Sequence, residues 1–389
     1  MEPHRNTVAH DLLAHFPWRH FDALVAQYGS DKGIRTLSTR TQFVALALAQ
    51  ASGISGLRET VTIVNSHEAK LYHLGATAVK RSTLSDANTL RSAKVFETLL
   101  TTMMASTQRR LRQDMTGLTY LIDSTSLKLN QRMAKWARFS ADVCGAKLHV
   151  IYDPDADQPI YAAFSAANVN DVTMALDMPI VPGATYVFDL GYYHFRWWQK
   201  MHLQRCRIVT RLKKHTRLTV TRERHLQPGL PILADRFGYL PGRQARSRRN
   251  PFQDEVREVV VRADNGKILR IVTNDLLSPA QEIADLYKRR WAIELHFRWI
   301  KQTLAIRKFN GTSENAIRTQ VFIAMIVFLL RRLAHASQQA VPSPLEFVRL
   351  VREHLMSRRD IANLRVPRRS RMRRHDVLEP ETGRMALAA

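Results

Sequence analysis

The chain has 389 residues, and its 59 Lys and Arg against 34 Asp and Glu give a formal net charge of +25 at pH 7. A hydrophobic content of 45% excludes wholesale disorder, and the two cysteines exclude a disulfide scaffold or a thiolate zinc cluster and indicate a reducing compartment. The longest apolar run, Val321–Leu330, is about half a membrane span, and no hydrophobic signal segment begins the chain. We therefore expect a soluble, cytoplasmic protein with no membrane partner and two or three domains, at roughly 100–200 residues per domain.

The large excess of positive charge predicts a nucleic acid partner, because Lys and Arg displace condensed counterions from phosphates. The alternative is a charged surface that only keeps the protein in solution. A far smaller imbalance is enough for that.

Apolar residues recur at helical spacing from residue 8 to about residue 110. Glycines 53, 56 and 75 interrupt this pattern, and a long helix is expected to begin near Ser82, with Ser82 or Thr83 as its N-cap. Short helices joined by small residues, with basic and amide side chains at the start of the second, are typical of a helix-turn-helix DNA reader; an ordinary helical bundle is the alternative. We expect six side chains of this region to face DNA: Lys80, Arg81, Ser82, Thr83, Asn88 and Arg91.

From residue 117 the pattern changes to short strands with helices between them, which predicts a mixed α/β sheet. The expected strands are Leu118–Asp123, Lys147–Tyr152, Ile160–Phe164, Ala184–Asp189 and Cys206–Leu212. Residues 213–278 read as a β-rich insertion that contains the basic loop Arg243–Arg249. Helices are expected again from Pro279 onward.

Two of these expected strands end in an aspartate, Asp123 and Asp189. The carboxyl ends of neighbouring strands are where α/β folds gather their ligands. A pair of buried carboxylates needs cations for neutralisation, and oxygen ligands suit magnesium or manganese. The alternative is that each aspartate only caps the turn that follows it.

A third acidic residue, Glu294, lies on the expected helix Pro279–Lys301. At about 100° per residue, Tyr287, Arg290, Glu294 and Lys301 project from one stripe about 60° wide. A solvated charged face could give the same spacing, but it would favour Lys and Glu without a Tyr in line.

The run Tyr287-x2-Arg290-x3-Glu294-x6-Lys301 resembles the signature, called YREK, of bacterial insertion-sequence transposases of the IS-four type. Leu121-Ile-Asp-Ser-Thr and Phe188-Asp-Leu-Gly-Tyr192 resemble the two aspartate blocks of that family. The resemblance extends to Lys147-Leu-His149 and to the segment from Arg81 to Asn88, so it covers about residues 10 to 350.

This resemblance implies an α/β fold with an RNase H-like mixed-sheet core and a β insertion before the glutamate. It implies that Asp123, Asp189 and Glu294 bind Mg2+, for which Mn2+ can substitute, and that Tyr287, Arg290 and Lys301 hold DNA phosphates. One relative stacks a flipped base on a Trp of its insertion, but this chain has no Trp between Trp198 and Trp291. The candidates to replace it are Phe237, Tyr239 and Phe252.

We expect a DDE transposase that binds the terminal inverted repeats of an insertion sequence, cuts the element ends and joins them to target DNA by two-metal phosphoryl transfer. Its expected partners are double-stranded DNA and, in the synaptic complex, a second copy of the chain near the bacterial nucleoid; the sequence has no Walker loop, so ATP is not expected. The alternatives are an RNase H-fold nuclease that does not join ends and a DNA-binding regulator without catalysis. The expected parts are a helical DNA-binding domain (1–112), the catalytic core (113–212 and 279–310), the insertion (213–278), C-terminal helices (311–356) and a basic flexible tail (357–389).

Overall fold

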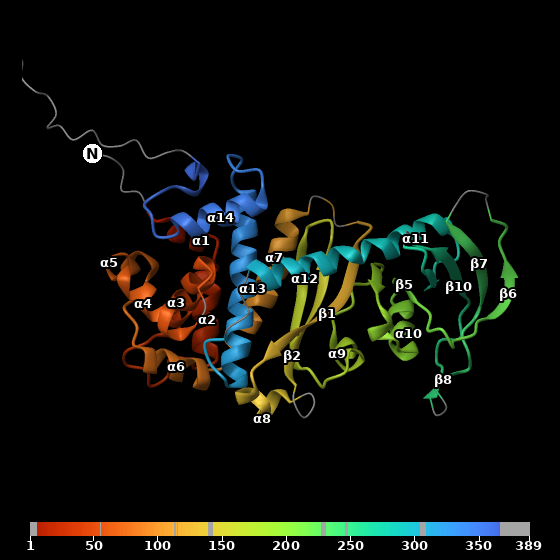
Figure 1. The fold of residues 1–389 in the computed structure, drawn as a ribbon, viewed down its shortest axis with the longest axis horizontal. Coiled ribbons are helices and arrows are strands. Elements are labelled where there is room, and N and C mark those ends of the chain that lie inside the picture. Colours follow the sequence, from red (N-terminus) through yellow and green to blue (C-terminus); the bar gives the residue numbers. More distant parts are fainter. Residues whose placement is uncertain are drawn as a thin grey trace, which may run out of the picture.

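The computed structural model describes residues 6–365, apart from 55, 113, 115, 139–142, 227–230, 246–247, 264 and 304–308. A helical part made of both ends of the chain packs beside one long sheet (Figure 1). Helices α11 (Ala280–Arg289) and α12 (Trp291–Thr303) run along the sheet toward α13 (Glu314–Ala336).

The N-terminal part consists of helices alone. These are α1 (Val8–Ala14), α2 (Trp18–Gln27), α3 (Thr39–Ser52), α4 (Leu57–Ser66), α5 (Glu68–Leu71), η1 (Tyr72–Leu74), α6 (Arg81–Leu90) and α7 (Lys94–Leu111). Helix α3 begins where the Ser38 hydroxyl accepts from the Thr41 N–H, and it ends at Gly53, whose φ of 69° suits a residue without a side chain. Most of its residues are buried, because neighbouring helices cover it on several sides.

The prediction of one long helix from Ser82 is wrong, because α6 ends at Leu90 and α7 starts separately at Lys94. The side chain of Asn315, on α13, inserts at the break. Its Nδ2 donates to the carbonyls of Asn88, at 2.9 Å, and Arg91, and its Oδ1 accepts from the Ala93 N–H at 3.0 Å. A tertiary contact thus satisfies the backbone groups that the break leaves open.

The sheet has nine strands in the order β3-β2-β1-β4-β5-β11-β10-β7-β6. Its first half consists of β1 (Thr119–Leu129), β2 (Cys144–Asp153), β3 (Gln158–Ala166), β4 (Thr185–Phe188) and β5 (Arg207–Arg211). Strands β1, β2 and β3 are antiparallel, whereas β4 and β5 run parallel to β1, with α9 (Asp171–Asp177), η3 (Leu190–Tyr192) and α10 (Phe195–Leu203) in the connections. This mixed arrangement confirms the predicted α/β, RNase H-like fold class.

The strands expected as an insertion continue the same sheet. They are β6 (Thr219–Glu223), β7 (Ile232–Tyr239), β10 (Val256–Arg262) and β11 (Ile268–Thr273), and β11 pairs antiparallel with β5. Strand β7 was missed by the sequence reading. The expected basic loop is in part a small ribbon, β8 (Arg243–Ala245) with β9 (Arg248–Arg249).

The chain returns through α11 (Ala280–Arg289), α12 (Trp291–Thr303), α13 (Glu314–Ala336) and α14 (Pro344–His354). The apolar run Val321–Leu330 lies in the middle of α13 and is buried between the N-terminal helices and the sheet. No helix in the described part of the chain is both long and apolar enough to cross a membrane.

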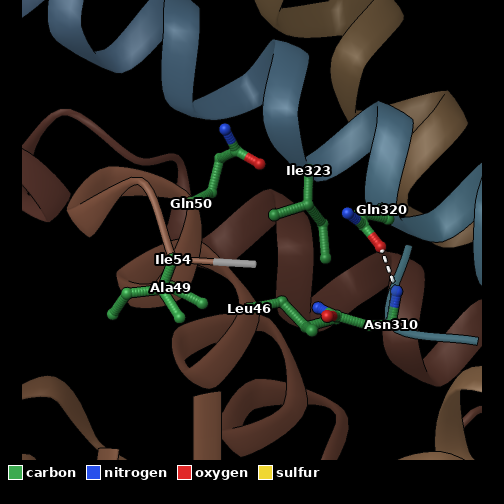
Figure 2. A pocket seen from close by; sticks show the side chains of 7 residues that line it. All are labelled: Leu46, Ala49, Gln50, Ile54, Asn310, Gln320 and Ile323. Atoms are coloured by element: carbon green, nitrogen blue, oxygen red, sulfur yellow. Dashed lines mark hydrogen bonds between the residues drawn. The ribbon is translucent and has the colours of Figure 1, made fainter. Parts of the chain in front are cut away.

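Helix α13 also meets α3 at a small polar junction (Figure 2). The Asn310 N–H donates to Gln320 Oε1 at 2.7 Å, and Asn310 Oδ1 accepts from the Gly56 N–H at 3.1 Å. The cavity there has a volume of about 10 Å³, which is room for no more than one water. The junction therefore fastens the N-terminal helices to α13 and leaves no space for a ligand.

The prediction of a flexible tail from Ser357 does not hold for residues 357–365. Residues 357–365 pack against α1, where the Ser357 carbonyl accepts from the Val8 N–H at 3.2 Å and Asp11 accepts from the Ile361 N–H at 3.3 Å. The rest of the expected tail, 366–389, lies outside the described residues.

Candidate active site

Asp123 and Asp189 come to adjacent places on two parallel strands. The last pair of the β1–β4 ladder is Ile122 with Phe188; Asp123 is the next residue of β1, and Asp189 directly follows the end of β4. The sequence predicts that Asp123 ends its strand, and this prediction is wrong. Ser124 and Thr125 continue the strand and do not form a turn. Strand β1 continues to Leu129 because β2 pairs with it over that whole length. The pairing of β1 with β4, by contrast, ends just before Asp123.

The residues that follow the two aspartates orient their carboxylates. The Ser124 N–H donates to Asp123 Oδ1 at 2.7 Å, and the Gly191 N–H donates to Asp189 Oδ1 at 2.8 Å. Each carboxylate is therefore fixed through one oxygen by a nearby backbone amide.

The two carboxylates also influence each other electrostatically. Burial, and then the negative charge of Asp189, raise the pKa of Asp123 to about 7, while the Ser124 N–H and the Arg290 guanidinium act in the opposite direction. A bound divalent cation would remove this repulsion between like charges. The pair thus has the electrostatic character of a cation site.

Glu294 joins this pair through Arg290. The Arg290 guanidinium donates to Glu294 Oε1 at 2.5 Å and to Asp123 Oδ2 at 3.4 Å, and its buried Nε has no partner in the described part of the chain. The structure therefore brings together all three acidic residues predicted from the sequence, with a cation between two of them.

The helix that carries these residues is not continuous, contrary to the prediction for Pro279–Lys301. Helix α11 ends at Arg289 and α12 starts at Trp291, although Arg290 between them keeps helical dihedrals (φ −52°, ψ −28°). Tyr287 is buried, and its ring lies 5.9 Å from the Arg290 guanidinium. Lys301 belongs to α12, but its side chain lies outside the described residues.

The donor chemistry of the site fits a hard divalent cation, because carboxylate oxygens are the ligands that Mg2+ prefers. Within the described residues, however, no group of three or more His, Cys, Asp or Glu side chains is arranged to hold a metal. The Glu294 carboxylate is instead engaged by the Arg290 guanidinium. The carboxylates of Asp123, Asp189 and Glu294 are the oxygen donors present here that suit such an ion.

Two of the expected DNA contacts in the N-terminal region are buried instead. Asn88 is 2% and Arg91 is 9% exposed. Gln42 connects them, since its Nε2 donates to Asn88 Oδ1 at 2.9 Å and its Oε1 accepts from Arg91 Nη1 at 3.2 Å; Arg91 also donates to the Leu37 carbonyl. In this structure, contrary to the expectation that they face outward, these two side chains are buried and connect α3 to the C-terminal end of α6.

The other four residues of that set lie at the start of α6. Lys80, Arg81 and Ser82 are exposed and Thr83 is half-buried. The predicted N-cap at Ser82 or Thr83 is wrong, because the helix begins at Arg81 and Lys80 takes the N-cap position without a side-chain bond. These four side chains lie at the surface of one helical turn.

Of the three aromatic residues considered in place of a base-stacking Trp, only Tyr239 is exposed, at 44%, whereas Phe237 and Phe252 are buried. Phe237 packs beneath the Arg222 guanidinium, which lies 3.7 Å from the ring centroid.

The sequence does not predict a role for Asp171, which the structure places next to Ser124 and Gly191. No spacing rule connected Asp171 with the two predicted aspartates.

The sequence matches two protein families. Residues 115–330 match the family described as Transposase DDE domain, and residues 4–77 match a domain of unknown function. The chain is 37% identical over 288 residues to the putative transposase y4zB of Sinorhizobium fredii, covering 73% of this chain and 80% of that protein. It is 31% identical over 241 residues to the probable transposase for insertion sequence element IS5377 of Geobacillus stearothermophilus, covering 60% of this chain and 61% of that protein. A solved piggyBac transposase synaptic complex with hairpin DNA is similar over 95% of this chain and 85% of that one, with 10% identity and a TM-score of 0.43.

Proposed function

This chain belongs to the DDE transposases of bacterial insertion sequences, and we propose that it binds the terminal inverted repeats of such an element, cuts at the ends and joins them to target DNA. Asp123 and Asp189 at adjacent strand positions, with Glu294 reached through Arg290, are the observation that supports this proposal most directly. The DNA substrate associates the protein with the nucleoid, and two element ends call for a homodimer in the synaptic complex.

Asp123, Asp189 and Glu294 would hold the metal. Bound Mg2+ or Mn2+ supplies an activated attacking oxygen and stabilises the leaving oxygen of an in-line phosphoryl displacement. The backbone N–H groups of Ser124 and Gly191 orient the two aspartates, so that each presents its other oxygen.

Arg290 has two roles in this proposal. In the structure it compensates the charge of Glu294 and Asp123. On DNA its planar guanidinium would turn to a phosphate, which is also an anion with paired oxygens. Tyr287 and Lys301 would hold the same strand in line for attack, which is catalysis by positioning.

The exposed start of α6 is proposed to contact the terminal repeat. Lys80 and Arg81 would bind phosphates, and Ser82 and Thr83 lie beside them on the same helical turn. Phosphate contacts fix the position of a protein on the duplex, whereas sequence is read from base edges.

A strand-transfer assay tests the whole proposal. The protein is incubated with Mg2+ or Mn2+, labelled duplexes carrying the terminal repeats of its own element, and a target plasmid. We expect cut ends and joined products, and neither from Asp189→Asn. Cutting without joining identifies a nuclease, and specific binding without cutting identifies a regulator; either result contradicts the proposal.

A further inference from the structure

A fourth carboxylate, Asp171, lies on the opposite side of the sheet from Glu294. It belongs to the first turn of α9. Asp171 Oδ1 accepts from the Ser124 hydroxyl at 3.1 Å and from Lys147 Nζ at 3.1 Å. Because successive side chains of a strand point to opposite faces, Ser124 faces Asp171 while Asp123 faces α12.

Asp171 touches both segments that orient the catalytic aspartates. One is Ser124, whose N–H donates to Asp123. The other is Gly191, whose N–H donates to Asp189. A Cβ at Gly191 would lie 2.9 Å from Asp189 Oδ1 and 3.2 Å from Asp171 Oδ2, so the two carboxylates approach this glycine closely from different elements.

The buried side chain of Tyr192 interacts electrostatically with the same carboxylates. It is 1% exposed. Burial, and then the charges of Asp171, Asp123 and Asp189, raise the pKa of its hydroxyl. The three carboxylates therefore lie around one buried point.

Lys147 provides the counter-charge beside Asp171, with its Nζ 3.1 Å from Asp171 Oδ1. Its Nζ also donates to the Val169 carbonyl at 3.0 Å, which fixes the ammonium between the two acceptors. His149 does not take this role. It is fully buried, burial lowers its pKa to about 4, and its Nδ1 lies 3.6 Å from Asp171, beyond hydrogen-bonding distance.

The order Ser165, His149, Asp171 looks like that of a hydrolase triad, since His149 Nε2 lies 2.8 Å from Ser165 Oγ. His149 in β2 and Ser165 in β3 are both buried, so no substrate reaches the Ser165 hydroxyl. The contacts among Ser165, His149 and Asp171 therefore have a structural role, which is to hold β2, β3 and α9 together.

We propose that Asp171, held by Lys147, is a positioning residue that fixes Asp123 and Asp189 at the separation a divalent cation requires. This inference rests on the proposed function. Outer groups that hold the ligands of a metal commonly change its affinity by about 10–100-fold when they are replaced. Asp171 acts through Ser124 and Gly191 and touches neither the metal nor the DNA.

The test measures Mn2+ binding by electron paramagnetic resonance on the full chain without DNA. We expect Asp171→Asn to weaken binding by about tenfold or more. Asp177→Asn removes the same charge from an exposed position of the same helix and should bind as the parent does. Lys147→Met should weaken binding as Asp171→Asn does, and Lys147→Arg should restore it.

Hydrogen exchange gives a second reading that needs no metal. Peptides covering 119–129 and 185–193 should exchange faster in Asp171→Asn than in Asp177→Asn, while the remaining peptides stay unchanged. If Asp171→Asn binds Mn2+ as tightly as Asp177→Asn does, with unchanged exchange, the inference is wrong although the proposed function stands. A parent protein that binds no Mn2+ overturns the proposed function, and the inference falls with it.

Discussion

Arg290 and Glu294 form an ion pair, at 2.5 Å, in the position where the third carboxylate of the site would meet its metal. The same guanidinium reaches Asp123 at 3.4 Å. A metal ion held by these carboxylates, as we propose, would therefore compete with the guanidinium for the same oxygens. Bound DNA would shift this competition toward the metal ion. A DNA phosphate near α12 would give Arg290 another anion to bind, and Arg290 would then release the carboxylates.

Replacement of Arg290 should separate metal binding from catalysis. Arg290→Ala frees Glu294 and Asp123, so we expect Mn2+ to bind several-fold more tightly without DNA. The same variant should cut end DNA about 100-fold more slowly, because a positioned cation beside the reacting phosphate is lost. The measurements are a Mn2+ titration and single-turnover cleavage.

Arg290→Lys is the control for charge alone. It keeps the positive charge but loses the planar pair of donors, so cleavage should remain well below that of the parent. Lys301→Ala should also slow cleavage, with initial binding of the terminal repeat hardly changed. Parental cleavage rates in both Arg290→Ala and Lys301→Ala would show that the α11–α12 face takes no part in the reaction.

Each of the three acidic residues should be needed for chemistry and not for DNA binding. Asp123→Ala, Asp189→Ala and Glu294→Ala remove groups that hold metal rather than phosphate, so cleavage should fall to background. Electrophoretic mobility shifts with the terminal repeat should stay close to those of the parent. Strand transfer retained by Asp189→Ala would contradict the assignment of that residue.

The buried position of Asn88 predicts an effect on stability rather than on specificity. Asn88→Ala leaves the Gln42 amide without its acceptor, which should lower the free energy of unfolding by about 1–3 kcal/mol. Thr89→Ala changes an exposed neighbour on the same helix and serves as the control in urea unfolding. If Asn88→Ala instead relaxes base preference with unchanged stability, the side chain reads DNA after a rearrangement.

Lys80 should behave differently, because it is exposed at the start of α6. Lys80→Ala should weaken binding to all DNA sequences alike, and it should reduce the slope of log affinity against log salt by about 1. Fluorescence anisotropy with repeat and random duplexes at several salt concentrations measures both effects. A loss confined to the repeat would show that Lys80 contacts a base edge.

The parts of the structure that the sequence predicted are those in which local pattern and final environment agree. The strand predicted at Ala184–Asp189 is found as β4, Thr185–Phe188, and all four of its residues are buried. The i,i+4 spacing of Arg290 and Glu294 was enough to predict that these two side chains lie close together. The end of β1 was placed six residues early because its second half is held by pairing with β2, which local composition does not reveal.

Contacts between distant residues account for the remaining errors. Asn88 looked like a surface amide because its partner Gln42 lies 46 residues away, and the break after α6 depends on Asn315, more than 220 residues away. Asp171 was missed for a similar reason, since its relation to Ser124 and Gly191 exists only once α9 packs behind the sheet. Such polar networks have no periodicity that a sequence could display.

His149 should make the stability of the protein depend on pH. Its folded pKa is about 4, mainly because of burial and in part because of Lys147, while Asp171 acts in the opposite direction; the unfolded value is near 6.5. Between these two values the unfolded chain binds a proton that the folded chain does not, so stability is lost as pH falls from about 6.5 toward 4, by no more than about 1.4 kcal/mol per pH unit. His149→Gln keeps a polar partner for Ser165 but does not titrate, so its free energy of unfolding should fall less steeply over this range. The measurement is urea unfolding of both proteins at pH 7.5, 6.5, 5.5 and 4.5. Parallel pH profiles for the two proteins would show that His149 binds protons equally in the folded and unfolded states, which contradicts a lowered pKa in the folded protein.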